Sequence, residues 1–269
     1  MYDSTEDLAR TVRADVVRMV HRARASHVAS SLSVADILAV LYGRIMRHRP
    51  DDPTWAERDR FILSKGHAAA AGYAVLARCG YFSPDVLDTY CENGSPLAGH
   101  LTASSGAPGV EVSTGSLGHG LPIAVGMALH LSRRLASSRV FVVISDGECD
   151  EGSTWEAALL AGHHSLAGLT VIVDSNKIQS FGRVDDVIRL EPLAEKWRSF
   201  GWSVAEVDGH DHSALIAALS RRSPAPSLVI ANTIKGKGVS FMEDDLLWHY
   251  RNPDDEQLSA ALREIDLGS

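Results

Sequence analysis

The dipeptide Asp146-Gly147, followed thirty residues later by Asn176, constrains this chain more than any other feature. Each polar arm directly follows an apolar run that is typical of a buried strand. Loops at the ends of two neighbouring strands can bring an aspartate oxygen and an amide oxygen to one hard cation, such as Mg²⁺. Each arm alone also fits a solvated cap or turn, because Asp-Gly and Asn are common turn residues. The pairing of the two arms favours a metal site.

From Gly118 onward, predicted strands and helices alternate along the chain. Such alternation is typical of an α/β fold with a doubly wound, mostly parallel sheet and helices on both faces. We therefore expect residues 1–269 to form a single domain whose ligand lies beyond the carboxyl ends of the strands. Strands are predicted at 60–64, 139–145, 169–174, 203–207 and 228–232.

The apolar periodicity and the capping residues predict the helices. Ser33 and Asp36 form a capping-box-like start for a helix that runs to about Met46, and Ser83-Pro84 begins another. Ser153 is expected to begin a later helix, with Glu156 completing its capping box. Residues 93–114 are rich in Gly, Pro and Ser and are predicted to be a loop. The helix that Ser83-Pro84 begins is expected near 84–91, and the remaining helices are expected at 5–24, 67–79, 119–136, after Pro192, and at 213–221 and 254–265.

Composition excludes several classes of function. The net charge of −8 argues against a nucleic-acid-binding surface, and no basic run suggests binding to an anionic membrane. No apolar stretch approaches the length of a membrane-spanning helix. Cys79, Cys91 and Cys149 are odd in number and lack C-x-x-C spacing, which predicts reduced thiols. Together with a polar N-terminus that does not resemble a signal peptide, these features predict a cytoplasmic protein.

Several further segments resemble those of transketolases, and they occur in the same order as in that family. RFILSKGH (60–67) is similar to the family's D-R-F-x-L-S-x-G-H segment, and GVEVSTGSLG (109–118) is similar to G-V-E-x-T-T-G-P-L-G. RASH (24–27), Gly99-His100 and the segment from TIKGKG (233–238) to Trp248-His249 also match. The chain is thus identified as the N-terminal, diphosphate-binding part of a transketolase. It departs from the family pattern at Ser26, Val28, Leu101, Ser116 and Ser145.

This resemblance implies a cofactor, thiamine diphosphate, and a divalent cation, Mg²⁺ or another such as Ca²⁺ or Mn²⁺. Asp146, Asn176 and the main-chain carbonyl of Ile178 would bind the cation. The implied catalytic residues are His27, His67, His100 and His249. The implied cofactor-binding residues include the metal ligands and also His67, Gly115, Ser116, Leu117, Gly118, Gly147, Glu148, Glu151 and His249.

The resemblance also implies the reaction and the partner. The reaction would transfer a two-carbon ketol unit from a ketose, in particular a ketose phosphate, to an aldehyde. Transketolases continue for several hundred residues beyond the matching part, so a C-terminal transketolase subunit with the pyrimidine-binding domain is expected as partner, in an α2β2 assembly. Three alternatives stay open: delivery of a two-carbon unit to a carrier protein or specialised acceptor, the α subunit of a 2-oxoacid dehydrogenase, and a non-catalytic cofactor-binding subunit.

Other residues have plainer interpretations. His163, His164, His210 and His212 match no motif and are interpreted as structural. Lys235 and Lys237 fit either a solvated turn or a phosphate contact. The small residues of the helix that begins near Gly118 suit packing against another subunit, although packing in the core fits nearly as well.

Overall fold

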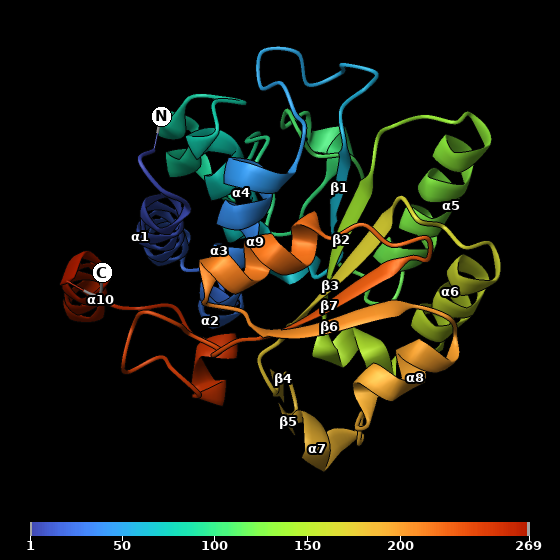
Figure 1. Ribbon diagram of the computed structural model, residues 1–269. Coiled ribbons are helices and arrows are strands. Elements are labelled where there is room, and N and C mark those ends of the chain that lie inside the picture. The colour runs from blue at the N-terminus through green and yellow to red at the C-terminus, as the bar shows by residue number, and fades with distance from the viewer. Residues whose placement is uncertain (1, 268–269) are drawn as a thin grey trace.

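The computed structural model describes residues 2–267, and its centre is a five-stranded parallel sheet in the order β1-β2-β3-β7-β6 (Figure 1). β7 lies between β3 and β6, although β6 precedes it in the sequence. A two-stranded antiparallel hairpin follows β3. The strands are β1 Arg60–Leu63, β2 Val140–Ser145, β3 Leu169–Ser175, β4 Ile178–Gln179, β5 Gly182–Arg183, β6 Ser203–Asp208 and β7 Ser227–Asn232.

Helices cover both faces of the sheet, as Figure 1 shows. One layer consists of α5, α6 and α8, and the opposite layer contains α1 to α4 and α9. The helices are α1 Thr5–Ala23, α2 Val28–Ser33, α3 Ala35–Val40, α4 Ala69–Arg78, α5 Gly120–Arg133, α6 Gly152–His163, α7 Val184–Val187, α8 Leu193–Ser199, α9 His212–Ser220 and α10 Asp255–Leu267. Leu41–Ile45 form a π-helical turn, and short 3₁₀ helices span Gly66–Ala68, Pro84–Thr89, Ala103–Ser105, Asp146–Asp150 and Leu246–His249.

Alternate residues of the central strands enter two separate hydrophobic cores, because successive strand side chains point to opposite faces. Phe141 and Val143 of β2 pack with the layer of α1 to α4, whereas Val142 and Ile144 pack with α5 and α6. All residues of β2 and β3 are buried. The predicted doubly wound, mostly parallel sheet with helices on both faces is therefore confirmed.

Two predicted helix caps are wrong. Ser33 does not cap a helix: it is the last residue of α2, and its buried hydroxyl donates to the Ser30 carbonyl and to Asp174. The predicted capping box at Glu156 is also absent. Ser153 instead donates to the Gly118 carbonyl, and the capping box lies earlier, between Ser145 and Glu148. The helix predicted at 84–91 is a 3₁₀ helix, although its Ser83 cap is confirmed.

The strand register brings the carboxyl ends of four strands to one edge of the sheet. Ser145 at the end of β2 pairs with Asp174 of β3, and Ser175 pairs with Asn232 of β7. Lys65 lies two residues after the end of β1, at the same edge. Within residues 2–267, the three cysteines are free thiols, and no helix is long and apolar enough to cross a membrane.

Candidate active site

The two polar arms that the sequence singled out meet at this edge of the sheet. One carboxylate oxygen of Asp146 accepts from its neighbour Gly147 N–H at 2.8 Å, and the other accepts from Lys177 N–H at 2.7 Å. The amide oxygen of Asn176 accepts from Ile178 N–H at 3.2 Å. Both side chains are therefore held against the same short stretch of backbone, residues 176–178. Both are also almost fully buried, at 3% exposure each.

A cavity of about 210 Å³ opens beside these arms, and the four predicted catalytic histidines all line it. The His27 ring centroid lies 5.4 Å from that of His67, 6.0 Å from that of His100 and 4.9 Å from that of His249. Of the other predicted residues, Gly115, Leu117, Asp146, Gly147, Asn176 and Ile178 also line the cavity. The structure thus brings together side chains from positions 27 to 249.

Three of these histidines are held as neutral imidazoles. Burial, and then the nearby His100, lower the pKa of His27 to about 4. Burial, and then the Lys235 ammonium, lower the pKa of His249 to about 3, and burial likewise lowers the pKa of His67 well below its usual range. A neutral imidazole can accept a proton at neutral pH. The cluster therefore offers unprotonated ring nitrogens to a bound hydroxyl group, while the lowered pKa also makes each imidazole a weaker base than a free histidine.

His27 has an unusual backbone conformation. Its φ of 71° lies in the left-handed region, which non-glycine residues adopt rarely, and it is the N-cap residue that precedes α2. Its main-chain N–H donates to the His249 carbonyl at 2.9 Å, and Ser26 Oγ lies 2.9 Å from its ring Nδ1. Backbone strain of this kind persists where the surrounding structure enforces it, often at functional sites.

Close contact between two segments places Gly66, the residue before His67, next to Gly115. A Cβ atom on Gly66 would lie 2.6 Å from the Gly115 nitrogen and 2.7 Å from the Thr114 carbonyl carbon. Only glycine allows the two backbones to approach so closely. The loop of residues 114–117, which belongs to the predicted cofactor-binding segment, is thereby fixed against the start of α4.

A buried ion pair that the sequence analysis missed lies close to the cavity. Lys65 and Asp174 are both completely buried and bonded to each other, and Asp174 also accepts from Ser33 and Thr233. Burial alone would raise the pKa of Asp174, but the Lys65 ammonium and these hydrogen bonds outweigh burial and lower it. Lys65 lies within a recognised motif, yet a lysine after a strand gives no sequence signal of full burial.

Lys235 is also buried, at 1% exposure, which excludes the solvated turn predicted as one of its alternatives. Its ammonium donates to the Ile178 carbonyl at 2.8 Å and lies 2.9 Å from His249 Nδ1, and Lys235 lines the cavity. Burial, and then the Lys65 ammonium, lower the pKa of Lys235 to about 8. Lys237, in contrast, is only half-buried and pairs with Glu243.

Four predicted cofactor-binding residues do not line this cavity: Ser116, Gly118, Glu148 and Glu151. Glu148 is fully buried and accepts from Ser64 Oγ and from the main-chain N–H groups of Gly118 and Ser145. It therefore joins the loops around the cavity. Ser116 and Glu151 are exposed on the surface of this chain.

The sequence matches the family described as "Transketolase, thiamine diphosphate binding domain" over residues 4–249. Two relatives have nearly the same length as this chain. One is the 6-deoxy-6-sulfo-D-fructose transketolase subunit of Clostridium sp. (strain MSTE9), 41% identical over 96% of this chain and 94% of its own. The other is an apulose-4-phosphate transketolase subunit of Phocaeicola vulgatus, 41% identical over 94% of this chain and 90% of its own.

Longer relatives match this chain in their structure. The crystal structure of transketolase from Campylobacter jejuni superposes with a TM-score of 0.92 and 32% sequence identity over 97% of this chain. The chain spans only 42% of that protein's length. The nearly equal lengths of the two subunit relatives agree with the predicted split organisation. The chain belongs to the transketolase family of transferases, in which it corresponds to the thiamine diphosphate binding domain.

Proposed function

We propose that this chain is the cofactor-anchoring subunit of a two-chain transketolase that requires thiamine diphosphate and Mg²⁺. It transfers a two-carbon ketol unit from a ketose, in particular a ketose phosphate, to an aldehyde. The observation that carries the proposal is the convergence of four histidine rings on the cavity that Asp146 and Asn176 also line. The family match supplies the cofactor class.

The residues at the cavity fit a divalent cation. Asp146, Asn176 and the Ile178 carbonyl offer three oxygens, the ligand type that Mg²⁺ prefers, with water and phosphate completing its shell. The Ile178 carbonyl accepts from the Lys235 ammonium, and a carbonyl oxygen has a second lone pair that can bind a cation. No group of three or more His, Cys, Asp or Glu side chains able to hold a metal occurs within residues 2–267. The proposed site therefore depends on one carboxylate with amide and carbonyl oxygens, and Ca²⁺ or Mn²⁺ fits the same set.

The remaining residues would hold the cofactor. Gly115, Leu117 and Gly147 offer main-chain groups on the cavity wall, while His67 and His249 offer imidazoles. We assign Lys235 as a further contact for the diphosphate, because its buried ammonium lies on the same wall. Three residues would support this wall from behind. The main-chain N–H of Gly118 donates to the Glu148 carboxylate, and the Glu151 side chain packs closely against Gly118.

The four histidines would perform the proton transfers. When bound, thiamine diphosphate supplies the electron sink for breaking the carbon–carbon bond. Cleaving a ketose requires a base for the proton of its C3 hydroxyl group and an acid that later returns a proton. His27 and His100 lie on the cavity wall with His67 and His249, and a neutral imidazole such as that of His27 can serve as that base.

A partner chain and a sugar substrate belong to the same proposal. We propose that a C-terminal transketolase subunit with the pyrimidine-binding domain completes the site in an α2β2 complex, in the cytoplasm. The subunit relatives carry the names of two different sugars, apulose 4-phosphate and 6-deoxy-6-sulfo-D-fructose. The shared machinery therefore fits several ketoses, and the partner chain is expected to select among them.

Reconstitution tests the proposal. The purified chain, its partner subunit, thiamine diphosphate and Mg²⁺ are mixed with a ketose phosphate donor and an aldose acceptor, and the new ketose is measured. We expect activity only in the complete mixture, together with Mg²⁺-dependent thiamine diphosphate binding by calorimetry. Full ketol transfer by this chain alone would contradict the two-chain proposal. Binding without turnover would favour a non-catalytic subunit.

A pair of histidine variants tests the catalytic assignment. His100→Ala is expected to lower kcat by about 10²- to 10⁴-fold, the usual contribution of a general acid or base. His163→Ala is the matched control, because His163 is also exposed but lies outside the cavity, next to His164. Equal rates for wild type and both variants would show that His100 does not transfer protons.

A further inference from the structure

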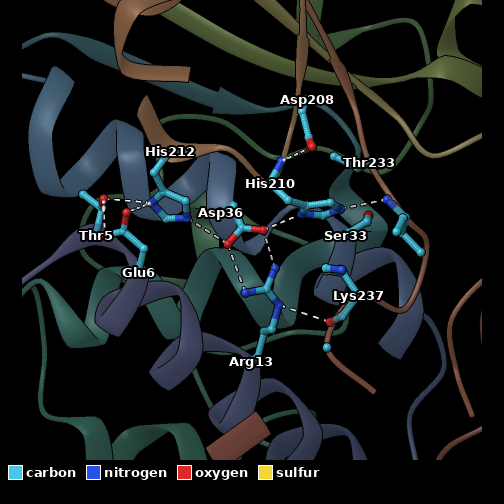
Figure 2. A network of polar contacts seen from close by, with 12 residues as sticks. Thr5, Glu6, Arg13, Ser33, Asp36, Asp208, His210, His212, Thr233 and Lys237 are labelled. Atoms are coloured by element: carbon cyan, nitrogen blue, oxygen red, sulfur yellow. Dashed lines mark hydrogen bonds and ion pairs between the residues drawn. The ribbon is translucent and has the colours of Figure 1, made fainter. Parts of the chain in front are cut away.

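Asp36 of α3 is the centre of a polar network close to the sheet edge but outside the candidate active site (Figure 2). Its carboxylate, at 4% exposure, accepts a bidentate interaction from the Arg13 guanidinium. It also accepts from His210 Nδ1 at 2.6 Å and from His212 Nε2 at 3.0 Å. Burial alone would raise the pKa of Asp36, but Arg13 and the two histidines lower it, so the carboxylate stays charged.

The hydrogen bonds of His210 fix its tautomer. Ile234 N–H can only donate, and it lies 2.9 Å from His210 Nε2, so this nitrogen is the acceptor. The proton must then be on Nδ1, where it points at the Asp36 carboxylate. Asp36 thus orients the ring, and the ring in turn satisfies a main-chain donor of the loop after β7.

This loop, residues 233–238, carries Lys235 into the candidate active site. Asp36 reaches it on both sides of Lys235: through His210 to Ile234 N–H, and through Arg13 Nε to the Lys237 carbonyl at 3.1 Å. The loop has further tethers at Gly236 N–H, which donates to the Ala29 carbonyl, and at the Lys235 carbonyl, which accepts from Asp244 N–H. Of the two histidines bonded to Asp36, His210 contacts the loop, whereas His212 contacts Thr5.

We propose that His210, oriented by Asp36, is a positioning residue that holds the loop of residues 233–238 and thereby sets the Lys235 ammonium against Ile178 and His249. The role of Lys235 as a cofactor contact rests on the function proposed above, whereas the bond between His210 and the loop does not. His210 does not line the candidate active site. It lines a separate cavity of about 340 Å³ with Arg13 and His212, so it would affect Lys235 only through the loop.

Two substitutions of His210 separate its two hydrogen bonds. In His210→Asn, the short amide can still donate to Asp36 from near the Nδ1 position, but it has no atom where Nε2 accepts from Ile234. In His210→Gln, the longer amide can place an oxygen near the Nε2 position. His212→Asn is the matched control, since it alters a bond to the same carboxylate without touching the loop.

Hydrogen exchange of the 269-residue chain alone, followed by mass spectrometry, is the first measurement. We expect exchange in residues 233–238 to rise about two- to tenfold in His210→Asn, which corresponds to the net contribution of one hydrogen bond. His210→Gln should restore slow exchange, and His212→Asn should leave this loop unchanged. The proposal would be overturned if residues 233–238 exchanged at the same rate in His210→Asn and His212→Asn, whether or not that rate exceeded the wild-type rate.

Kinetics of the reconstituted two-chain complex are the second measurement. His210→Asn should raise the KM for thiamine diphosphate several-fold with a smaller change in kcat, while His212→Asn should change neither. Faster loop exchange without any rise in this KM would also overturn the proposal, because Lys235 would then not depend on His210. An inactive wild-type complex would count against the proposed function alone, since the exchange experiment requires no cofactor.

Discussion

Replacing Asp174 by Asn tests the buried ion pair near the candidate active site. The substitution keeps the size of the side chain but removes its negative charge. Lys65, at 0% exposure, would then have only neutral acceptors: the Ser30 carbonyl, 3.0 Å from its ammonium, and the new amide oxygen. Removing one partner of a buried pair leaves an uncompensated charge, which costs about 3–5 kcal/mol.

The predicted loss is a large share of the total stability, since a typical domain unfolds with a free energy of about 5–15 kcal/mol. For a chain of this size, such a loss corresponds to a fall in Tm of roughly 6–20 °C. Urea unfolding of the wild-type and variant chains, followed by circular dichroism, would measure the difference directly. The Arg198–Glu206 pair, 3.6 Å apart and half-exposed, provides a control, and Glu206→Gln should cost less than about 1 kcal/mol.

A double variant separates the lost attraction from other effects of the substitution. Lys65→Met removes the stranded ammonium, so Lys65→Met/Asp174→Asn is expected to be more stable than Asp174→Asn alone. A loss below about 1 kcal/mol in Asp174→Asn would refute the reasoning. So would a double variant whose loss equals the sum of the two single losses, because independent sites behave in that way.

Three further substitutions have expected outcomes. Gly66→Ala should destabilise the chain by about 1–3 kcal/mol in urea unfolding, because its Cβ meets backbone at 2.6 Å, whereas Gly126→Ala, with open space in α5, should not. The lowered pKa of His27 means that the unfolded chain binds its proton first as pH falls, so wild-type stability should decline between about pH 6.5 and about pH 4. His27→Gln should flatten this decline in urea midpoints, and parallel curves would contradict the assignment. Asp146→Ala should abolish the Mg²⁺ dependence of thiamine diphosphate binding in calorimetry, and retained dependence would exclude Asp146 as a ligand.

The sequence predicted the candidate site better than its surroundings, for a physical reason. The carboxyl ends of parallel strands meet at one edge, so short motifs after predicted strands converge even when they are far apart in the chain. Asp146 and Asn176 follow that rule. His27 and His100 lie in loops and helix starts, and only their similarity to family motifs placed them together.

The errors and omissions have a common cause in long-range contacts. Ser33 has the local pattern of a helix cap, but its hydroxyl instead donates a hydrogen bond to Asp174, which is distant in the sequence. Lys65 and Asp36 look like ordinary charged residues in their own segments. Their burial depends on partners from other elements, Asp174 for one and the Arg13 and His210 side chains for the other. Periodicity and turn chemistry carry no information about such pairs.

The position of β7 has a consequence for synthesis of the chain. A ribosome releases β3 well before β7, whose final residue is Asn232, so one edge of β3 stays unpaired while more than fifty further residues are added. All seven residues of β3 are buried in the folded chain. Exposed, unpaired strand edges readily pair with other chains. Nascent chains should therefore depend on chaperones until β7 inserts, and incomplete chains should aggregate.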